Sequence, residues 1–247
     1  MDMAKKIALI TGGLGGIGRE ICIQMGQAGY TVVSTFMRPG RDERWLADMK
    51  EMGIEAYCYK CDVSDFDACQ ELFAAINRDV GTVSILVNNA GITKDGTLRK
   101  MTPDQWHDVI NTNLYSVFNT SKCCIEGMMN QGFGRIINVS SVNGQKGQFG
   151  QSNYSAAKAG VHGFTMSLAQ EVARKGVTVN TISPGYTATE MVMAIQESIR
   201  EQIIADIPVG RLGRPDEIAA LVVFLAGEQA GFITGANIAI NGGQQMQ

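Results

Sequence analysis

The chain has 247 residues, of which 45% are hydrophobic and 18% charged, and its formal net charge at pH 7 is −3. This composition excludes a disordered chain, and the longest apolar run, Ile218–Ala226, is far shorter than the ~20 residues of a membrane span. The weakly acidic balance argues against nucleic acid as the main partner. Glycine is in excess, with 29 residues or about 12% against a usual ~7%, so we expect the glycines to serve a folded site.

The cysteines and histidines give no sign of disulfides or of a metal site. The six cysteines follow no regular framework, and Met1–Ile10 lacks the apolar stretch of a signal peptide. Cys58 and Cys61 have the spacing of a redox or zinc half-site, but no second pair or nearby histidine completes it. We therefore expect a cytoplasmic protein with reduced, structural thiols and no bound metal.

Short apolar runs alternate along the chain with segments of helical period. The predicted strands are Lys6–Ile10, Thr31–Thr35, Glu55–Tyr59, Val83–Val87, Arg135–Ser140, Thr178–Ile182 and Asn237–Ile240. The predicted helices are Gly16–Ala28, Asp42–Met52, Asp65–Val80, Pro103–Asn130 and Asn153–Lys175, followed by a helical region from Thr189 to Gly227.

This alternation predicts an α/β fold with a seven-stranded parallel sheet and helices on both faces. No polar linker or repeat interrupts the pattern, so we expect residues 1–247 to form a single doubly wound domain. Ligands of such sheets bind outside the carboxyl ends of the strands, and the loops at that edge are therefore the place to look for a site.

The loop after the first predicted strand is rich in glycine and leads directly into a helix. Its candidate diphosphate-binding residues are Gly12, Gly13, Gly15, Gly16, Ile17 and Gly18. Glycines allow the backbone to approach a phosphate closely, and the start of a helix favours negative charge. The spacing is not the usual G-x-G-x-x-G, so this signal gains its weight from the strand before it and the helix after it.

The end of the second predicted strand bears on which dinucleotide binds. An acidic residue at this place bonds a ribose 2′-hydroxyl, whereas an arginine accommodates a 2′-phosphate. No acid occurs there before Asp42, and Arg38 and Arg41 are present. The sequence therefore predicts NADP(H) over NAD, although both arginines also fit solvated loop positions.

Tyr154 and Lys158 are four residues apart at the start of a predicted helix and share one of its faces. The lysine ammonium is expected to stabilise phenolate and so to lower the tyrosine pKa. Ser141 ends an earlier strand and offers a hydroxyl to a carbonyl oxygen, and Asn113 is a polar residue in an apolar stretch. Together these four residues are the candidate catalytic set.

In order and spacing, these motifs resemble those of the short-chain dehydrogenase/reductase family over essentially the whole chain. The resemblance implies a Rossmann-type fold and a hydride-transfer oxidoreductase. Tyr154 would be its acid/base, Ser141 would hold the substrate oxygen, Lys158 would bind the nicotinamide ribose, and Asn113 would support a proton relay. Further cofactor contacts implied by the resemblance are Asp62, Val63, Asn89, Ala90, Gly91, Pro184, Gly185 and Thr187.

The loop before Tyr154 is similar to that of the acetoacetyl-CoA reductases, which supply (R)-3-hydroxybutyryl-CoA for polyhydroxybutyrate synthesis. The expected substrate contacts, besides Ser141 and Tyr154, are Asp95, Gln148, Phe149, Gln151 and Tyr186. The alternatives are a 3-oxoacyl-[acyl-carrier-protein] reductase and a dinucleotide-binding regulatory protein without catalysis.

Three further expectations concern the surroundings of this site. The phosphates of an acyl-CoA substrate need positive charge, for which Lys94, Arg99, Lys100 and Lys146 are available without a choice among them. Residues 188–210, with Met191–Ile207 at their centre, are a candidate substrate lid or else a fixed amphipathic helix. Family resemblance implies a homotetramer that packs its long helices together.

Overall fold

The computed structural model describes residues 6–246, and all seven predicted strands are present within two residues of their expected bounds. The strands are β1 (Ile7–Ile10), β2 (Thr31–Phe36), β3 (Ala56–Lys60), β4 (Val83–Asn88), β5 (Gly134–Val139), β6 (Val177–Pro184) and β7 (Asn237–Ile240). They form one parallel sheet in the order β3-β2-β1-β4-β5-β6-β7. This confirms the doubly wound Rossmann-type fold, and the strand order reverses direction between β1 and β4.

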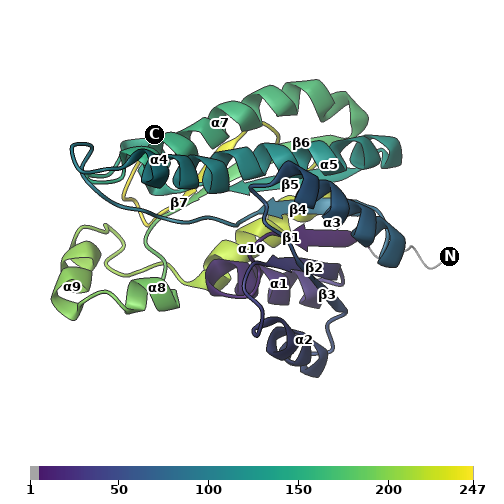
Figure 1. Cartoon of the computed structure of the whole chain (residues 1–247), viewed down its shortest axis with the longest axis horizontal. Coiled ribbons are helices and arrows are strands. Elements are labelled where there is room, and N and C mark those ends of the chain that lie inside the picture. The colour runs from purple at the N-terminus through teal and green to yellow at the C-terminus, as the bar shows by residue number, and fades with distance from the viewer. Residues whose placement is uncertain (1–5, 247) are drawn as a thin grey trace.

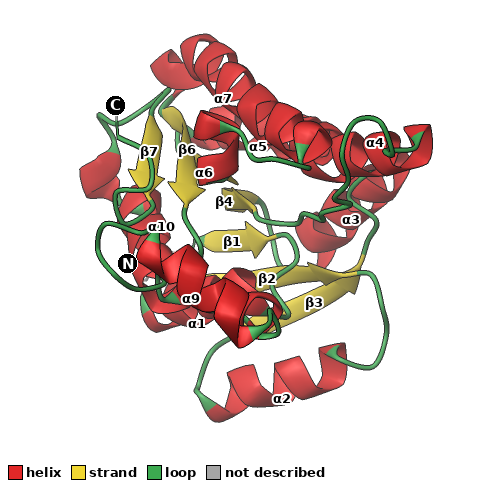
Figure 2. Ribbon diagram, turned by 90° about the vertical axis from the view of Figure 1, so that its left-hand side faces the viewer, coloured by secondary structure: helices red, strands yellow, loops and turns green. Residues whose placement is uncertain are grey.

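Helices cover both faces of the sheet, as Figure 2 shows. They are α1 (Gly16–Gln27), α2 (Asp42–Glu51), α3 (Phe66–Asp79), α4 (Pro103–Ile110), α5 (Ser116–Gln131), α6 (Val142–Lys146), α7 (Ser152–Val172), α8 (Glu190–Met193), α9 (Glu197–Ala205) and α10 (Pro215–Ala226). Helix α1 packs against α10 on one face, and α3 packs against α5 on the other. In Figure 1, α8 and α9 project from the body of the molecule.

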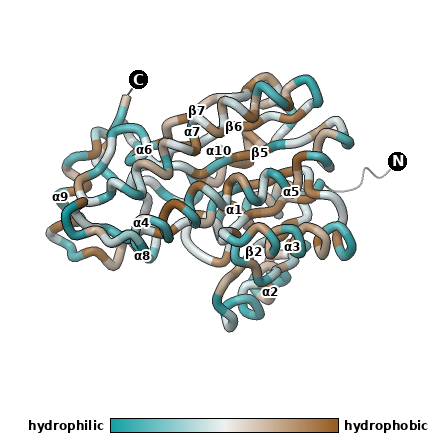
Figure 3. The backbone as a smooth tube through the Cα atoms, turned by 45° about the horizontal axis from the view of Figure 1, so that its top comes forward, coloured by the Kyte–Doolittle hydropathy of each residue, from teal (hydrophilic) through white to brown (hydrophobic). Residues whose placement is uncertain are grey.

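Two hydrophobic cores result from the alternation of side chains along the strands. In β1, Ala8 and Ile10 belong to the core under α1, α2 and α10, whereas Ile7 and Leu9 belong to the core under α3, α5 and α7. In Figure 3, hydrophobic backbone follows the strands, while α9 and α2 carry hydrophilic stretches. Among residues 6–246, no helix is both long enough and apolar enough to cross a bilayer.

The predicted helix Pro103–Asn130 is interrupted by a π-helical segment, Asn111–Tyr115. The side chain of Asn113 explains the interruption, because its Nδ2 donates to the Val109 carbonyl at 2.8 Å. In a regular α-helix that carbonyl would accept from the backbone N–H of Asn113. Such local π turns frequently occur at functional sites.

Two loops differ from their sequence-based description. The loop after β5 contains the short helix α6, which is capped by the preceding residue Ser141; the Ser141 hydroxyl accepts from Asn143 N–H at 3.1 Å. The helical region predicted over Thr189–Gly227 divides into α8, α9 and α10. The last of these begins at Pro215, which is favourable at a first helical position but not inside a helix.

Candidate active site

The glycine loop after β1 has the conformation that its composition predicts. Gly12 and Gly16 have φ values of 67° and 54°, in the left-handed region that residues other than glycine rarely adopt. A Cβ atom at Gly18 would lie 2.5 Å from the Gly12 carbonyl oxygen, and one at Gly13 would lie 2.4 Å from Ser34 Oγ. The loop therefore cannot be built with larger residues at these positions.

The start of α1 fits a diphosphate. Gly15 provides no side-chain cap, and the first turn carries no acidic residue, so backbone N–H groups at this end are available to an anion. The tight packing of Gly18 against the loop brings the helix start close to β1. The residues present thus fit the phosphates of a dinucleotide.

Thr11 and Asn89 fasten this loop to β4. The Thr11 hydroxyl accepts from the backbone N–H groups of Asn89 and Ala90 at 3.0 Å each. The Asn89 carboxamide donates to the Thr11 carbonyl at 2.9 Å. The side chain of Asn89 is therefore engaged in holding the loop, which leaves the backbone of residues 89–91 at the edge where a cofactor would pass.

The residues expected around the adenosine end lie farther along the same edge. Arg38 and Arg41 are exposed in the loop between β2 and α2. Asp42, the first acid after β2, accepts from Gly40 N–H at 2.9 Å. Asp62 accepts from the Ser64 N–H at 2.9 Å, and the Val63 carbonyl accepts from Asn119 Nδ2 at 3.0 Å.

Lys158 and Asn113 are buried beneath the catalytic edge. Lys158 Nζ donates to the Val139 carbonyl at 2.7 Å, and burial lowers the pKa of this lysine to about 8. Asn113 Oδ1 accepts from Ile92 N–H at 3.2 Å, and its Nδ2 donates to the Ile92 carbonyl at 2.9 Å. A Cβ at Gly91 would come within 2.5 Å of Asn113 Oδ1, so Gly91 provides clearance for this side chain.

Tyr154 lies beside Ser141, with Lys158 Nζ 5.6 Å from the centre of its ring. The expected lowering of the tyrosine pKa does not occur in this structure. Burial raises the pKa of Tyr154 above its ordinary value, the charge of Asp95 raises it further, and a hydrogen bond with Ser141 opposes the shift. At neutral pH the hydroxyl is therefore protonated, which is the state that a proton donor needs.

These groups meet in a cleft of about 460 Å³ at the carboxyl edge of the sheet. The predicted site residues that line it are Ile17, Asn89, Gly91, Asp95, Ser141, Gln151, Tyr154, Lys158, Pro184, Gly185, Tyr186 and Thr187. The cleft thus extends from the start of α1 to the catalytic hydroxyl groups. Its remaining wall includes Met191, Val192, Ile195 and Ile203, from the segment expected to act as a lid.

Two predicted substrate residues line a neighbouring hollow and not this cleft, and their contact with substrate stays a prediction. Gln148 and Phe149 are exposed and line a separate hollow beside the cleft. Gln151 does face the cleft, where its Nε2 donates to Asp95 Oδ2 at 2.9 Å and its Oε1 accepts from Asn143 Nδ2 at 2.9 Å. The structure therefore brings Asp95 and Gln151 together and sets Gln148 and Phe149 apart from them.

Asn143 and Asn153 also support the site, although neither was predicted from the sequence. Asn143 contacts both Ser141, through its backbone N–H, and Gln151, through its side chain. Asn153 Nδ2 donates to the carbonyls of Lys94 and Gln105, at 3.0 and 3.2 Å, and so fixes the loop that carries Asp95. A signal was available, because asparagines flanking a candidate tyrosine and serine are suited to capping and loop bonds.

This combination of fold, glycine turn and catalytic cleft defines a class of enzyme. The sequence profile described as short chain dehydrogenase matches residues 6–200, and the chain belongs to this family. It is accordingly an oxidoreductase that uses a nicotinamide dinucleotide.

Several curated relatives cover almost the whole chain. The "Acetoacetyl-CoA reductase" of Shinella zoogloeoides is 56% identical over 240 residues, which are 97% of this chain and 98% of the relative. The protein of the same description from Cupriavidus necator is 52% identical over 245 residues, or 99% of this chain and 100% of the relative. A 3-oxoacyl-[acyl-carrier-protein] reductase of Vibrio harveyi is 45% identical over 246 residues and the full length of both proteins.

Proposed function

We propose that the protein reduces acetoacetyl-CoA to (R)-3-hydroxybutyryl-CoA with NADPH. The observation that carries this proposal is the meeting of Ser141, Tyr154 and Lys158 in a cleft that begins at the diphosphate-binding turn. Full-length similarity to acetoacetyl-CoA reductases supports the choice of substrate.

In the proposed reaction, the hydroxyl groups of Ser141 and Tyr154 act on the carbonyl group of the substrate. When bound, the reduced nicotinamide supplies the hydride that adds to the keto carbon. Ser141 and Tyr154 direct their hydroxyl groups at the carbonyl oxygen, where negative charge develops, and Tyr154 then gives its proton to that oxygen. The raised pKa of Tyr154 keeps this proton in place until the charge appears.

Lys158 and Asn113 support this chemistry from beneath. The Lys158 ammonium lies close to the tyrosine ring and favours the phenolate that remains after proton transfer. As the family resemblance implies, Lys158 would also bind the nicotinamide ribose. Asn113 would hold a water that returns a proton to Tyr154 through Lys158, and its bonds to Ile92 fix its position for that role.

The preference for NADP(H) rests on the loop after β2. Arg38 and Arg41 are exposed there and suited to a 2′-phosphate, while the nearby carboxylate of Asp42 is engaged by the Gly40 N–H. Asp62 and Val63 would flank the adenine, the backbone of Asn89, Ala90 and Gly91 would pass the ribose, and residues 184–187 would border the nicotinamide.

The acyl group would lie against Asp95, Gln151 and Tyr186. Gln151 is held from two sides, by Asn143 and by Asp95, so its carboxamide presents a fixed edge to the cleft. We further propose that the segment around residues 188–210 closes over the substrate, that one domain carries all these functions, and that the protein is a cytoplasmic homotetramer which supplies polyhydroxybutyrate synthesis.

A comparison of two thioesters tests this proposal. Purified protein is assayed for NADPH oxidation with acetoacetyl-CoA and with acetoacetyl-[acyl-carrier-protein] at matched concentrations. We expect the higher kcat/KM with acetoacetyl-CoA, and a preference for the carrier protein would favour the role of the Vibrio harveyi relative instead. Absence of turnover with both thioesters would instead favour a dinucleotide-binding regulatory protein without catalysis.

A further inference from the structure

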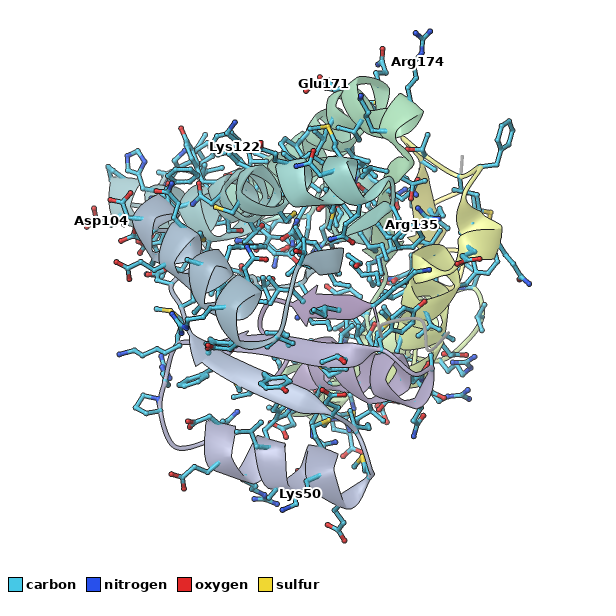
Figure 4. All side chains as sticks on the ribbon, turned by 90° about the vertical axis from the view of Figure 1, so that its right-hand side faces the viewer. Lys50, Asp104, Lys122, Arg135, Glu171 and Arg174 are labelled. Atoms are coloured by element: carbon cyan, nitrogen blue, oxygen red, sulfur yellow. The ribbon has the colours of Figure 1, made fainter. Side chains whose placement is uncertain are left out.

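His162 is a titratable side chain on α7 that has no role in the reaction proposed above. It follows Lys158 by four residues and Tyr154 by eight, so the three side chains lie along one face of the helix. Helix α7 has 21 residues, and its last turn, which carries Glu171, lies at the outer edge of the molecule (Figure 4). Contacts along the middle of α7 therefore bear on where its catalytic residues lie.

One nitrogen of the His162 ring contacts Ser140, the residue before Ser141. His162 Nε2 lies 2.9 Å from Ser140 Oγ. The Ser140 hydroxyl has one proton, which it donates to the Lys158 carbonyl at 2.9 Å, so Nε2 is the donor of the bond between the ring and Ser140. Ser140 is thus held against α7 by both a backbone carbonyl and an imidazole.

The same ring contacts β6 and β7. Asn237 Nδ2 donates to His162 Nδ1 at 3.4 Å, and the Asn237 carbonyl oxygen accepts from Ser183 Oγ at 2.7 Å. A ring that donates through Nε2 and accepts at Nδ1 is the neutral tautomer with its proton on Nε2. Burial and then the charge of Lys158 lower the pKa of His162, so the ring is neutral at pH 7.

These bonds connect parts of the cleft that are distant in sequence. Ser140 precedes Ser141, and Ser183 precedes Pro184; Ser141 and Pro184 both line the cleft. One imidazole therefore joins the ends of β5 and β6 to the helix that carries the catalytic tyrosine. Reaction rates depend steeply on such geometry, since a displacement of about 1 Å can cost about 10²-fold.

We propose that His162 is a positioning residue whose Nε2–H holds the residue before Ser141 against the helix that carries Tyr154. Its other ring nitrogen extends this hold to β7 through Asn237. The inference rests on the function proposed above and adds to it a residue that acts through Ser140. The part of the cleft lining that the structure describes does not include His162.

Two substitutions separate the hydrogen bond from the shape of the ring. In His162→Gln the carboxamide nitrogen is as many bonds from Cα as Nε2 and still donates to Ser140, whereas His162→Phe keeps a ring and removes both nitrogens. With acetoacetyl-CoA, His162→Phe should lower kcat about tenfold or more and leave KM within about twofold, because geometry and not binding changes. His162→Gln should restore kcat to within about threefold of wild type.

Single-turnover kinetics distinguish misplacement from partial unfolding. NADPH-loaded protein is mixed with excess acetoacetyl-CoA, and NADPH deuterated at the transferred hydrogen identifies the hydride-transfer phase. His162→Phe should keep the amplitude of this phase and lower its rate constant, whereas a loss of folded protein would lower the amplitude alone. His107→Phe, at the exposed second histidine of the chain, is the matched control and should equal wild type. An unchanged rate constant in His162→Phe, or equal losses in His162→Gln and His162→Phe, would overturn the assignment.

The state of the ring is measured without substrate. In His107→Phe, His162 is the remaining histidine, so ¹⁵N spectra of ring-labelled, NADP-saturated protein report it alone. We expect a protonated Nε2 and an unprotonated Nδ1 at pH 7, and Ser140→Ala should shift the Nε2 signal. The opposite tautomer or a charged ring would refute the positioning bond. The expected tautomer in a protein that reduces neither thioester would place the failure in the proposed function instead.

Discussion

Replacement of Lys158 by methionine should stabilise the protein while it abolishes efficient catalysis. Lys158 is only 4% exposed, and among residues 6–246 its ammonium has a single hydrogen bond, to the Val139 carbonyl at 2.7 Å. Burial lowers its pKa from 10.5 to about 8, because the charged form has lost its hydration. Methionine has a similar length and carries no charge, so it removes this penalty without leaving a large cavity.

The size of the effect follows from the pKa change. At about 1.36 kcal/mol per unit, the shift corresponds to about 3 kcal/mol, from which the lost hydrogen bond to Val139 takes about 1 kcal/mol. We therefore expect Lys158→Met to raise the free energy of unfolding at pH 7 by about 2 kcal/mol.

The stability difference between Lys158→Met and wild type should also change with pH, in a direction that the lowered pKa of Lys158 determines. Below about pH 8 the lysine is charged in both the folded and the unfolded chain, and the full penalty applies. Between about pH 8 and pH 10.5 the folded protein loses this proton while the unfolded chain keeps it, so wild type becomes relatively more stable as pH rises. The advantage of the variant should therefore shrink across that range.

Urea unfolding of wild type and Lys158→Met at one protein concentration, from pH 6.5 to pH 10, measures both the stability difference at pH 7 and its change with pH. Lys175→Met, at an exposed lysine, is the matched control and should match wild type at every pH. A variant less stable than wild type at pH 7, or a difference that does not change with pH, would refute the reasoning about the buried charge.

Three further variants test separate parts of the site. Tyr154→Phe should lower kcat by about 10²–10⁴-fold while NADPH affinity stays near wild type in a fluorescence titration, and near-normal turnover would remove Tyr154 from its role. Arg41→Ala should weaken NADPH binding by about tenfold or more and NADH binding little; equal losses would mean that Arg41 does not contact the 2′-phosphate. Gly18→Ala places a Cβ atom 2.5 Å from the Gly12 carbonyl oxygen and should destabilise the fold by about 1–3 kcal/mol and impair NADPH binding. Gly163→Ala should do neither, because its Cβ atom would meet no atom of the described chain within 4 Å outside its own helix backbone.

The strands and the edge that carries the site could be predicted from the sequence. The apolar runs of β1 and β4 are buried on both faces, so their position depends on local composition alone. The glycine turn was equally predictable, because Gly12 and Gly16 require backbone angles that few other residues adopt.

Features that depend on tertiary contacts could not be predicted in this way. The π-helical turn at Asn113 depends on a side chain that bonds both Val109 and Ile92, and the second contact joins residues 21 positions apart. The pKa of Tyr154 was predicted to be lowered but is raised, for a similar reason. Its sequence neighbour Lys158 was visible, but burial and the charge of Asp95 follow only from the folded structure.

The separation of Gln148 and Phe149 from Gln151 has a comparable origin. All three lie within four positions of one another, yet Gln151 turns toward Asp95 and Asn143 while Phe149 remains 87% exposed. Loop direction here depends on the bond between Gly96 and Gly150, which joins two distant segments of the chain.

The function that we propose for this cleft is the reduction of a short β-ketoacyl-CoA with NADPH. The most direct measurement is the oxidation of NADPH by the purified protein upon addition of acetoacetyl-CoA, with chiral analysis of the product. We predict stoichiometric formation of (R)-3-hydroxybutyryl-CoA at a rate well above that with NADH. The absence of acetoacetyl-CoA-dependent NADPH oxidation would contradict this function.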